Sequence, residues 1–148
     1  MIYLIPMLVA LTGTLGLNDD KAPAPAQIEF RRAETKPAAG LTEADDPMMN
    51  DKIYLHKKVE LDNKDILSAT LDKPPQARSY VVHLTLTNEG ARKMKALTRQ
   101  LMNKRLAVLV DGKVISAPFI TSEVSKHAYV ETMNKEMAQR IVNAFGGK

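Results

Sequence analysis

The stretch from residue 80 to residue 117 constrains the fold most, because it predicts a strand, a helix and a hairpin in direct succession. Residues 80–86 alternate largely between core-facing apolar positions and the opposite face, which is the pattern of a half-buried strand. Thr87 then stands at the N-cap position of a helix of about four turns. Apolar positions of the helix recur at three- and four-residue spacing and predict one buried stripe: Ala91, Met94, Leu97, Thr98 and Leu101.

A hairpin follows the helix. Asp111 and Gly112 separate the apolar run 106–110 from residues 113–117. Asp-Gly between two such runs is a strong hairpin signal, because a type I′ turn needs positive φ at both central residues. A two-residue loop also fixes the register, so we expect Val110 to face Lys113 and Val108 to face Ile115.

The rest of the chain predicts an α+β domain. Strand patterns occur at residues 27–34, 53–61, 69–71 and 128–131, and a second helix begins at a Thr132 or Asn134 cap. We therefore expect a mixed, mainly antiparallel sheet with two main helices packed on one face, in an order close to a split βαβ unit. Residues 35–52 contain two prolines and an acidic run without a sustained period, which predicts a mobile loop.

The N-terminal part differs in composition from the domain. Residues 1–17 hold no charged side chain and are short for a membrane span, which is typical of a signal peptide or an N-terminal anchor. Residues 18–26 form a linker rich in Pro and Ala. The folded domain is expected at residues 27–148, and membrane association would run through residues 2–17.

Basic side chains are the clearest charge feature of the predicted first helix and its C-terminal flank: Arg92, Lys93, Lys95, Arg99, Lys104 and Arg105. They are either the solvated face of an amphipathic helix or a contact surface for an acidic partner, with Arg92, Lys95 and Arg99 as the partner-binding candidates. No aromatic residue interleaves with them, so no stacking platform for nucleic acid is expected.

Chemical signals are weak elsewhere. His56, His83 and His127 have no neighbour at metal-ligand spacing and are interpreted as isolated histidines. Ser116 lies in V-I-S-A-P and not in a nucleophile elbow, and no phosphate-binding Gly-rich loop is present. We expect no catalytic residue, no metal site and no cofactor, and hence a non-enzymatic binding module.

Four methionines stand at helical positions or beside helices: Met94, Met102, Met133 and Met137. Their spacing favours core filling. The alternative is an adaptable apolar surface that binds unfolded segments.

Residues 86–120 carry a family resemblance. LTNEGARKMKALTRQLMNKRLAVLVDGKVISAPFI resembles the head subdomain in the first extracytoplasmic (P1) domain of SecD, the accessory subunit of the bacterial protein-export translocase. That family has roughly L-T-x-E-G-A-x-K-F, a helix, and then G-K-R-L-A-I-V-L-D-G-K-V-I-S-A-P. Met94 stands where the family usually has Phe, and Asn103 where it usually has Gly. The likeness extends over about residues 27–146.

The resemblance implies the same α+β class and an extracytoplasmic location, in the periplasm or on the outer face of the membrane. It implies contact with unfolded or exported polypeptide during preprotein translocation, and Sec translocon components as further partners. The family's Gly-rich segment after the hairpin is replaced here by Val124-Ser-Lys-His-Ala. The alternative is a stand-alone exported protein-binding module that reuses the head fold without a role in translocation.

Overall fold

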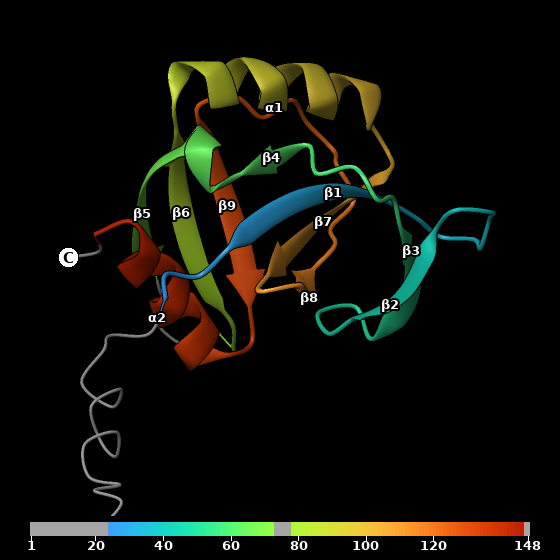
Figure 1. Ribbon diagram of the computed structural model, residues 1–148, viewed down its shortest axis with the longest axis horizontal. Coiled ribbons are helices and arrows are strands. Elements are labelled where there is room, and N and C mark those ends of the chain that lie inside the picture. The colour runs from blue at the N-terminus through green and yellow to red at the C-terminus, as the bar shows by residue number, and fades with distance from the viewer. Residues whose placement is uncertain (1–23, 73–77, 147–148) are drawn as a thin grey trace, which may run out of the picture.

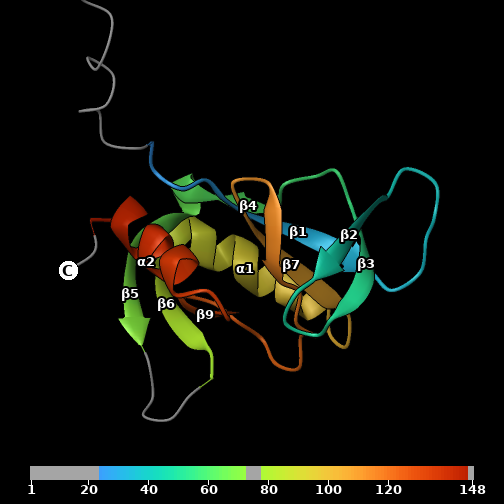
Figure 2. The ribbon, with the colours of Figure 1, turned by 90° about the horizontal axis from the view of Figure 1, so that it is seen from below.

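The computed structural model describes residues 24–72 and 78–146 (Figure 1). The expected signal or anchor at residues 1–17 and most of the linker lie outside this part of the chain. The described residues form two antiparallel sheets and two α-helices, which confirms the α+β class and the antiparallel pairing (Figures 1 and 2). The split βαβ arrangement on a single sheet is not observed.

The larger sheet has six strands in the order β2-β3-β1-β7-β8, with β4 pairing beside β3 on β1. These strands are β1 (Ile28–Glu34), β2 (Thr42–Asp46), β3 (Asp51–Leu55), β4 (Leu61–Asp62), β7 (Arg105–Val110) and β8 (Lys113–Ser116). The smaller sheet has the order β5-β6-β9 and consists of β5 (Ile66–Asp72), β6 (Tyr80–Leu86) and β9 (His127–Thr132).

Helix α1 (Asn88–Gln100) runs along the top of the view in Figure 1 and contacts both sheets, through β4 and β6. The Thr87 hydroxyl accepts a hydrogen bond from the Gly90 amide at 3.0 Å, which is the expected cap. A short 3₁₀ turn, η1 (Asn63–Asp65), contacts the start of α1. Helix α2 (Lys135–Ala144) begins at the Asn134 cap and covers the inner face of the smaller sheet.

The buried hydrophobic residues form two clusters. The main core lies between the two sheets and both helices, and it includes Phe30, Leu84, Met94 and Ile141. A second cluster occupies the other face of the larger sheet, around Ile53 and its neighbours. All six residues of β7 are buried because this strand serves both clusters.

The hairpin turn between β7 and β8 has φ 51° at Asp111 and φ 82° at Gly112, the two positive values that a type I′ turn requires. Val110 pairs with Lys113 as expected, but Val108 pairs with Ser116 and not with Ile115, because a bulge shifts the register.

Three boundaries differ from expectation. The expected loop at residues 35–52 contains β2 and the start of β3, which pair into a hairpin. The expected strand 53–61 ends at Leu55, and the chain pairs with β1 again only at Leu61. Ala26 is 1% exposed and belongs to the main core, so the packed domain begins before residue 27.

Candidate functional site

A buried arginine organises the hairpin of β2 and β3. Arg105 is 1% exposed, which corrects the expectation that it lies on a solvated basic face. Its guanidinium forms ion pairs with Asp46 and Asp51 on the hairpin, and its Nε donates to the Ala117 carbonyl at 2.8 Å. The pKa of Asp51 lies below its usual range because Arg105 donates hydrogen bonds to it. A charge this deep requires such partners, so Arg105 anchors the hairpin to β7.

The same guanidinium also contacts two apolar side chains. Its Nη2 lies 3.4 Å from Met49 Sδ, and its Cζ lies 5.1 Å from the centroid of the Phe119 ring, a cation–π contact. Met49 belongs to the β2–β3 hairpin, and Phe119 follows β8. Arg105 therefore fixes the relative positions of two walls of a hollow.

That hollow, the apolar groove, has a volume of about 350 Å³. It lies between the tip of the β2–β3 hairpin, the end of β8 and strand β9. Its lining residues are Asp46, Met48, Met49, Val108, Ser116, Ala117, Pro118, Phe119, Tyr129 and Glu131. Three large hydrophobic side chains that line it remain exposed: Met49 by 50%, Phe119 by 43% and Tyr129 by 66%. Exposed apolar side chains that lie together in a hollow make it a candidate interaction site.

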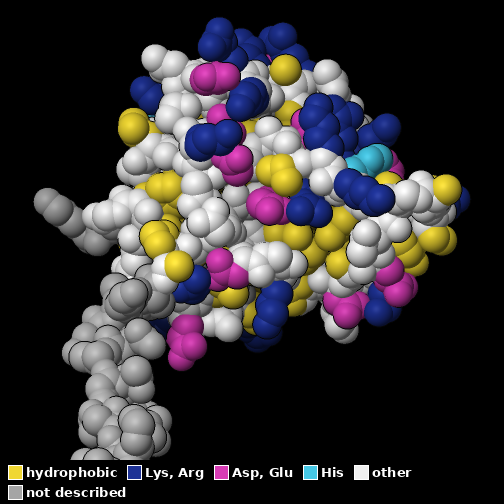
Figure 3. All heavy atoms as spheres, viewed as in Figure 1, with side chains coloured by type: hydrophobic (Ala, Val, Ile, Leu, Met, Phe, Trp, Pro, Cys, Tyr) yellow, Lys and Arg dark blue, Asp and Glu magenta, His cyan; other side chains and the backbone are white. Residues whose placement is uncertain are grey.

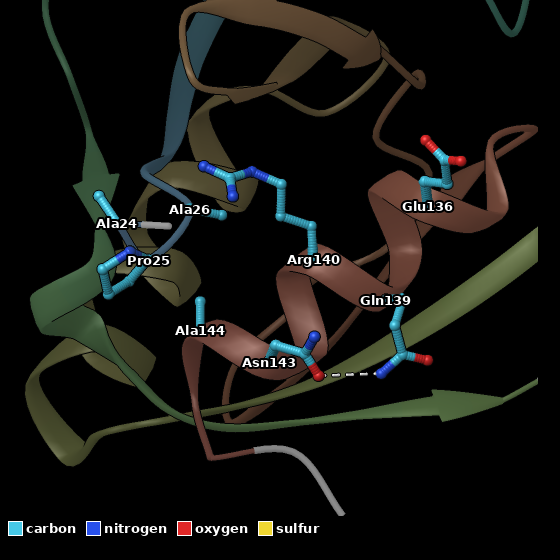
Figure 4. Close-up of a pocket in the computed structure, with 8 residues that line it drawn as sticks. All are labelled: Ala24, Pro25, Ala26, Glu136, Gln139, Arg140, Asn143 and Ala144. Atoms are coloured by element: carbon cyan, nitrogen blue, oxygen red, sulfur yellow. Dashed lines mark hydrogen bonds between the residues drawn. The ribbon is translucent and has the colours of Figure 1, made fainter. Parts of the chain in front are cut away.

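A second hollow, of about 490 Å³, lies between residues 24–26 and α2 (Figure 4). Glu136, Gln139, Arg140 and Asn143 make up half of its lining. None of its lining residues is among the exposed large hydrophobic side chains of the described chain. The groove beside Phe119 is therefore the hollow of the two that is lined by exposed large hydrophobic side chains.

The expected basic residues lie apart from the apolar groove. Lys and Arg side chains gather over α1 at the top of the molecule (Figure 3). Lys95 and Arg99 both form ion pairs with Glu123, and the Arg99 hydrogen bond is the main cause of the lowered pKa of Glu123. Arg92 is exposed and forms no ion pair within the described residues. Whether these three residues contact a partner stays a prediction.

The Asp111 carboxylate also contacts residues outside the hairpin turn. Its carboxylate accepts hydrogen bonds from the Gln27 amide at 3.0 Å and from Arg140 Nε at 2.8 Å. These contacts, with Arg140 the larger cause, hold the pKa of Asp111 below its usual range. The turn thus joins β1 and α2 to the hairpin.

Two of the three histidines are not isolated, which corrects the expectation for His83 and His127. His83 Nε2 lies 2.9 Å from His127 Nδ1, and the His83 ring stacks on Tyr129. His56 instead contacts Glu34, with 3.0 Å between His56 Nε2 and Glu34 Oε1. Only strand pairing brings His83 and His127 together, because 44 positions separate them.

The methionines divide between core and surface. Met94 is 1% exposed, as the core interpretation predicts, and Met137 is half-buried. Met102 and Met133 are exposed and do not fill the core. Met49, which the sequence pattern did not single out, is the methionine that lines the groove together with Met48.

Within residues 24–72 and 78–146, no group of three or more His, Cys, Asp or Glu side chains is placed to hold a metal ion. No helix in this described part of the chain has the length and apolar character needed to cross a membrane.

The fold and the groove together define a small α+β domain with an exposed apolar hollow beside one buried ionic cluster. Residues 39–144 match the SecDF P1 head subdomain family. The chain belongs to this family, which confirms the resemblance seen in the sequence.

Two similar proteins are protein translocase subunits. The protein translocase subunit SecD of Petrotoga mobilis is 34% identical over 62 residues, which is 42% of this chain and 13% of that protein. The subunit SecDF of Thermus thermophilus is 48% identical over 44 residues, covering 30% of this chain and 6% of that protein. The chain therefore spans less than a fifth of the length of these relatives.

Solved structures agree on the fold. A SecDF described as a membrane component that enhances protein export matches with a TM-score of 0.63 and 24% identity, over 84% of this chain and 64% of that chain. A SecDF crystal structure in a super-membrane-facing form matches with a TM-score of 0.62 and 26% identity, over 83% of this chain and 19% of that chain.

Proposed function

We propose that this domain acts on the extracytoplasmic side of the membrane in protein translocation, where it contacts exported polypeptide through the apolar groove. Family membership supports the link to translocation. The exposed Met49, Phe119 and Tyr129 side chains carry the proposal for polypeptide contact. The domain does this as a binding module without catalysis of its own.

The groove suits a ligand of low sequence specificity. Met48 and Met49 have flexible thioether side chains that adapt to different apolar partners. Tyr129 offers a large aromatic face at its rim. Strand β9 borders the groove and is an edge of the smaller sheet, so main-chain pairing with an extended segment adds affinity that does not depend on the guest's side chains.

The basic residues of α1 have a secondary role in this proposal. Arg92, Lys95 and Arg99 bias binding toward acidic segments through a screened, salt-sensitive attraction. Because Glu123 already pairs with Lys95 and Arg99, their contribution is smaller than three free cations would give. Sec translocon components are further partners under the same proposal.

The test is fluorescence anisotropy of the full chain with a labelled polypeptide that stays unfolded without denaturant. We expect binding at tens of micromolar, roughly −6 kcal/mol. Met49→Gln and Tyr129→Ser should each weaken it by about fivefold or more, the loss typical of a residue central to an interface.

Met133→Gln is the matched control, because Met133 is 56% exposed but does not line the groove. It should leave the affinity unchanged. The triple change of Arg92, Lys95 and Arg99 to Ala should reduce binding only at low salt. No binding at tens of micromolar would contradict the polypeptide contact. Equal losses for Met49→Gln and Met133→Gln would place the contact outside the groove.

A substrate-panel screen tests the absence of catalysis. We expect no turnover that a single side-chain change abolishes, because Ser116 lies at the end of strand β8 and not in a nucleophile elbow. Turnover that depends on one side chain would contradict this part of the proposal.

A further inference from the structure

The outer face of the smaller sheet carries a pair of histidines. His83 on β6 and His127 on β9 lie on neighbouring antiparallel strands, where His83 pairs with Tyr129 and Thr85 pairs with His127. Their ring nitrogens are 2.9 Å apart, and their ring centroids are 5.0 Å apart. His127 is exposed and His83 half-exposed, whereas the alternate residues of both strands point into the main core. Both imidazoles are therefore accessible to small solutes.

We propose that His83 Nε2 and His127 Nδ1 form a two-imidazole site for a late divalent transition-metal ion such as Ni²⁺ or Cu²⁺. Imidazole nitrogen is a preferred ligand of these metals. The described chain supplies no third His, Cys, Asp or Glu to this group. Water completes the coordination, so the site is open and of modest affinity. The proposal does not depend on the proposed role in translocation.

The distance between the two nitrogens matches this chemistry. Imidazole nitrogens bind such metals at about 2.0–2.1 Å, so two of them at a right angle lie about 2.8–3.0 Å apart. At a tetrahedral angle the same bond lengths place them about 3.3–3.4 Å apart. The observed 2.9 Å is the length of a hydrogen bond between the two rings, and it is also compatible with the right-angle geometry of square-planar or octahedral ions. The pair is thus suited to Ni²⁺ and Cu²⁺ more than to tetrahedral Zn²⁺.

Tyr129 holds one of the ligands in place. Its ring stacks on His83 with 4.9 Å between centroids and 16° between planes. A ligand whose ring orientation is already fixed loses less freedom when a metal binds. The pair is therefore partly organised for metal binding before the ion arrives.

Metal binding requires the proton shared by the two rings to move to another ring nitrogen. In the neutral pair one nitrogen donates its proton to the other, whereas a metal needs a lone pair on both. The donor ring can carry its proton on its other nitrogen, so binding to the neutral pair releases no net proton.

The surroundings of the pair favour a cation. Across the strands the pair faces hydroxyl-bearing residues and an aromatic ring: Thr70, Thr85 and Tyr129. Asp72 and Glu131 follow on the same face of β5 and β9 by the alternation of strand residues. Lys126 precedes His127 and is the neighbouring positive charge in sequence.

The experiment is a calorimetric titration of the full, untagged chain with NiCl₂ near pH 7.5. We expect one Ni²⁺ per chain, and at least about tenfold weaker binding after either His83→Gln or His127→Gln. His56→Gln is the matched control, because His56 is a partly exposed histidine that contacts Glu34 and not another histidine. It should bind Ni²⁺ as the wild type does.

Nuclear magnetic resonance separates metal binding from any effect of the substitutions on folding. Paramagnetic Ni²⁺ should broaden the imidazole signals of His83 and His127 in the unmodified chain and leave those of His56 sharp. Broadening of all three histidines alike, or Ni²⁺ binding that survives the double change of His83 and His127, would overturn the proposal. Tighter binding of Zn²⁺ than of Ni²⁺ at the pair would contradict the right-angle geometry.

Discussion

Replacing Arg105 with Met should be among the most damaging single changes in the chain. The substitution keeps an apolar stem but removes both ion pairs, so the Asp46 carboxylate loses its cation in a site where its side chain is 0% exposed. Breaking a buried pair in this way typically costs about 3–5 kcal/mol. Asp51 contributes less to the loss, because its side chain is 44% exposed and water can solvate it.

Two further variants separate the lone charge from the lost packing. Arg105→Met combined with Asp46→Asn removes the uncompensated charge, and we expect it to regain about 1–2 kcal/mol over the single variant. Arg99→Met is the surface control. Arg99 pairs with Glu123, but its side chain is 62% exposed, so its loss should stay below about 1 kcal/mol.

The assay is urea unfolding followed by circular dichroism, with the free energy of unfolding taken from the midpoint and slope. Arg105→Met should also weaken polypeptide binding in the anisotropy titration, because Met49 and Phe119 lose their common contact. A loss below about 1 kcal/mol, or a double variant no more stable than the single one, would refute the reasoning.

Three other changes test separate features. Gly90→Ala should destabilise by about 1–3 kcal/mol despite better helix propensity, because the added Cβ would lie 2.4 Å from the Asp65 carbonyl oxygen; a thermal midpoint equal to wild type would contradict this. Gly112→Val should cost about 1–3 kcal/mol because its φ is 82°, and unchanged urea stability would show that the turn tolerates a β-branched residue. The lowered pKa of Asp111 implies stability that is present above about pH 4 and lost as the pH falls through the folded-state pKa. Asp111→Asn should therefore flatten the acid end of the stability curve, and an unchanged acid slope would remove the Arg140 contact from the account.

Local signals explain the elements that could be predicted. The Thr87 cap and the apolar spacing of α1 depend on neighbours in sequence, and so does the Asp111-Gly112 turn. The buried positions Met94 and Leu97 follow from the same spacing. These features needed no knowledge of the distant parts of the chain.

The groove could not be predicted, because it depends on distant partners. In the sequence, Arg105 is one of six basic residues in and after a predicted helix. Its burial depends on the ion pair with Asp46, which is 59 positions away. The same ion pair explains why the polar strand β2 forms where a loop was expected. Asp46 and Asp51 pair across the β2–β3 hairpin. In the sequence, the acidic run that contains Asp46 has no sustained period and predicts a loop.

The two histidines illustrate the same limit. His83 shows its strand face in the sequence, but the partner strand β9 and its register are not encoded locally. A one-residue change in register would move His127 to the opposite face of the sheet. The pair is therefore a property of tertiary structure.

Photo-crosslinking tests the central claim, polypeptide contact at the groove, most directly. Phe119, replaced by p-benzoylphenylalanine in the full chain, should crosslink to a labelled unfolded polypeptide on irradiation. The same probe at Leu67, which is 64% exposed on β5 and does not line the groove, is the control and should give little product. Strong crosslinking at Phe119 alone is the predicted result, and equal yields at both positions would contradict the account.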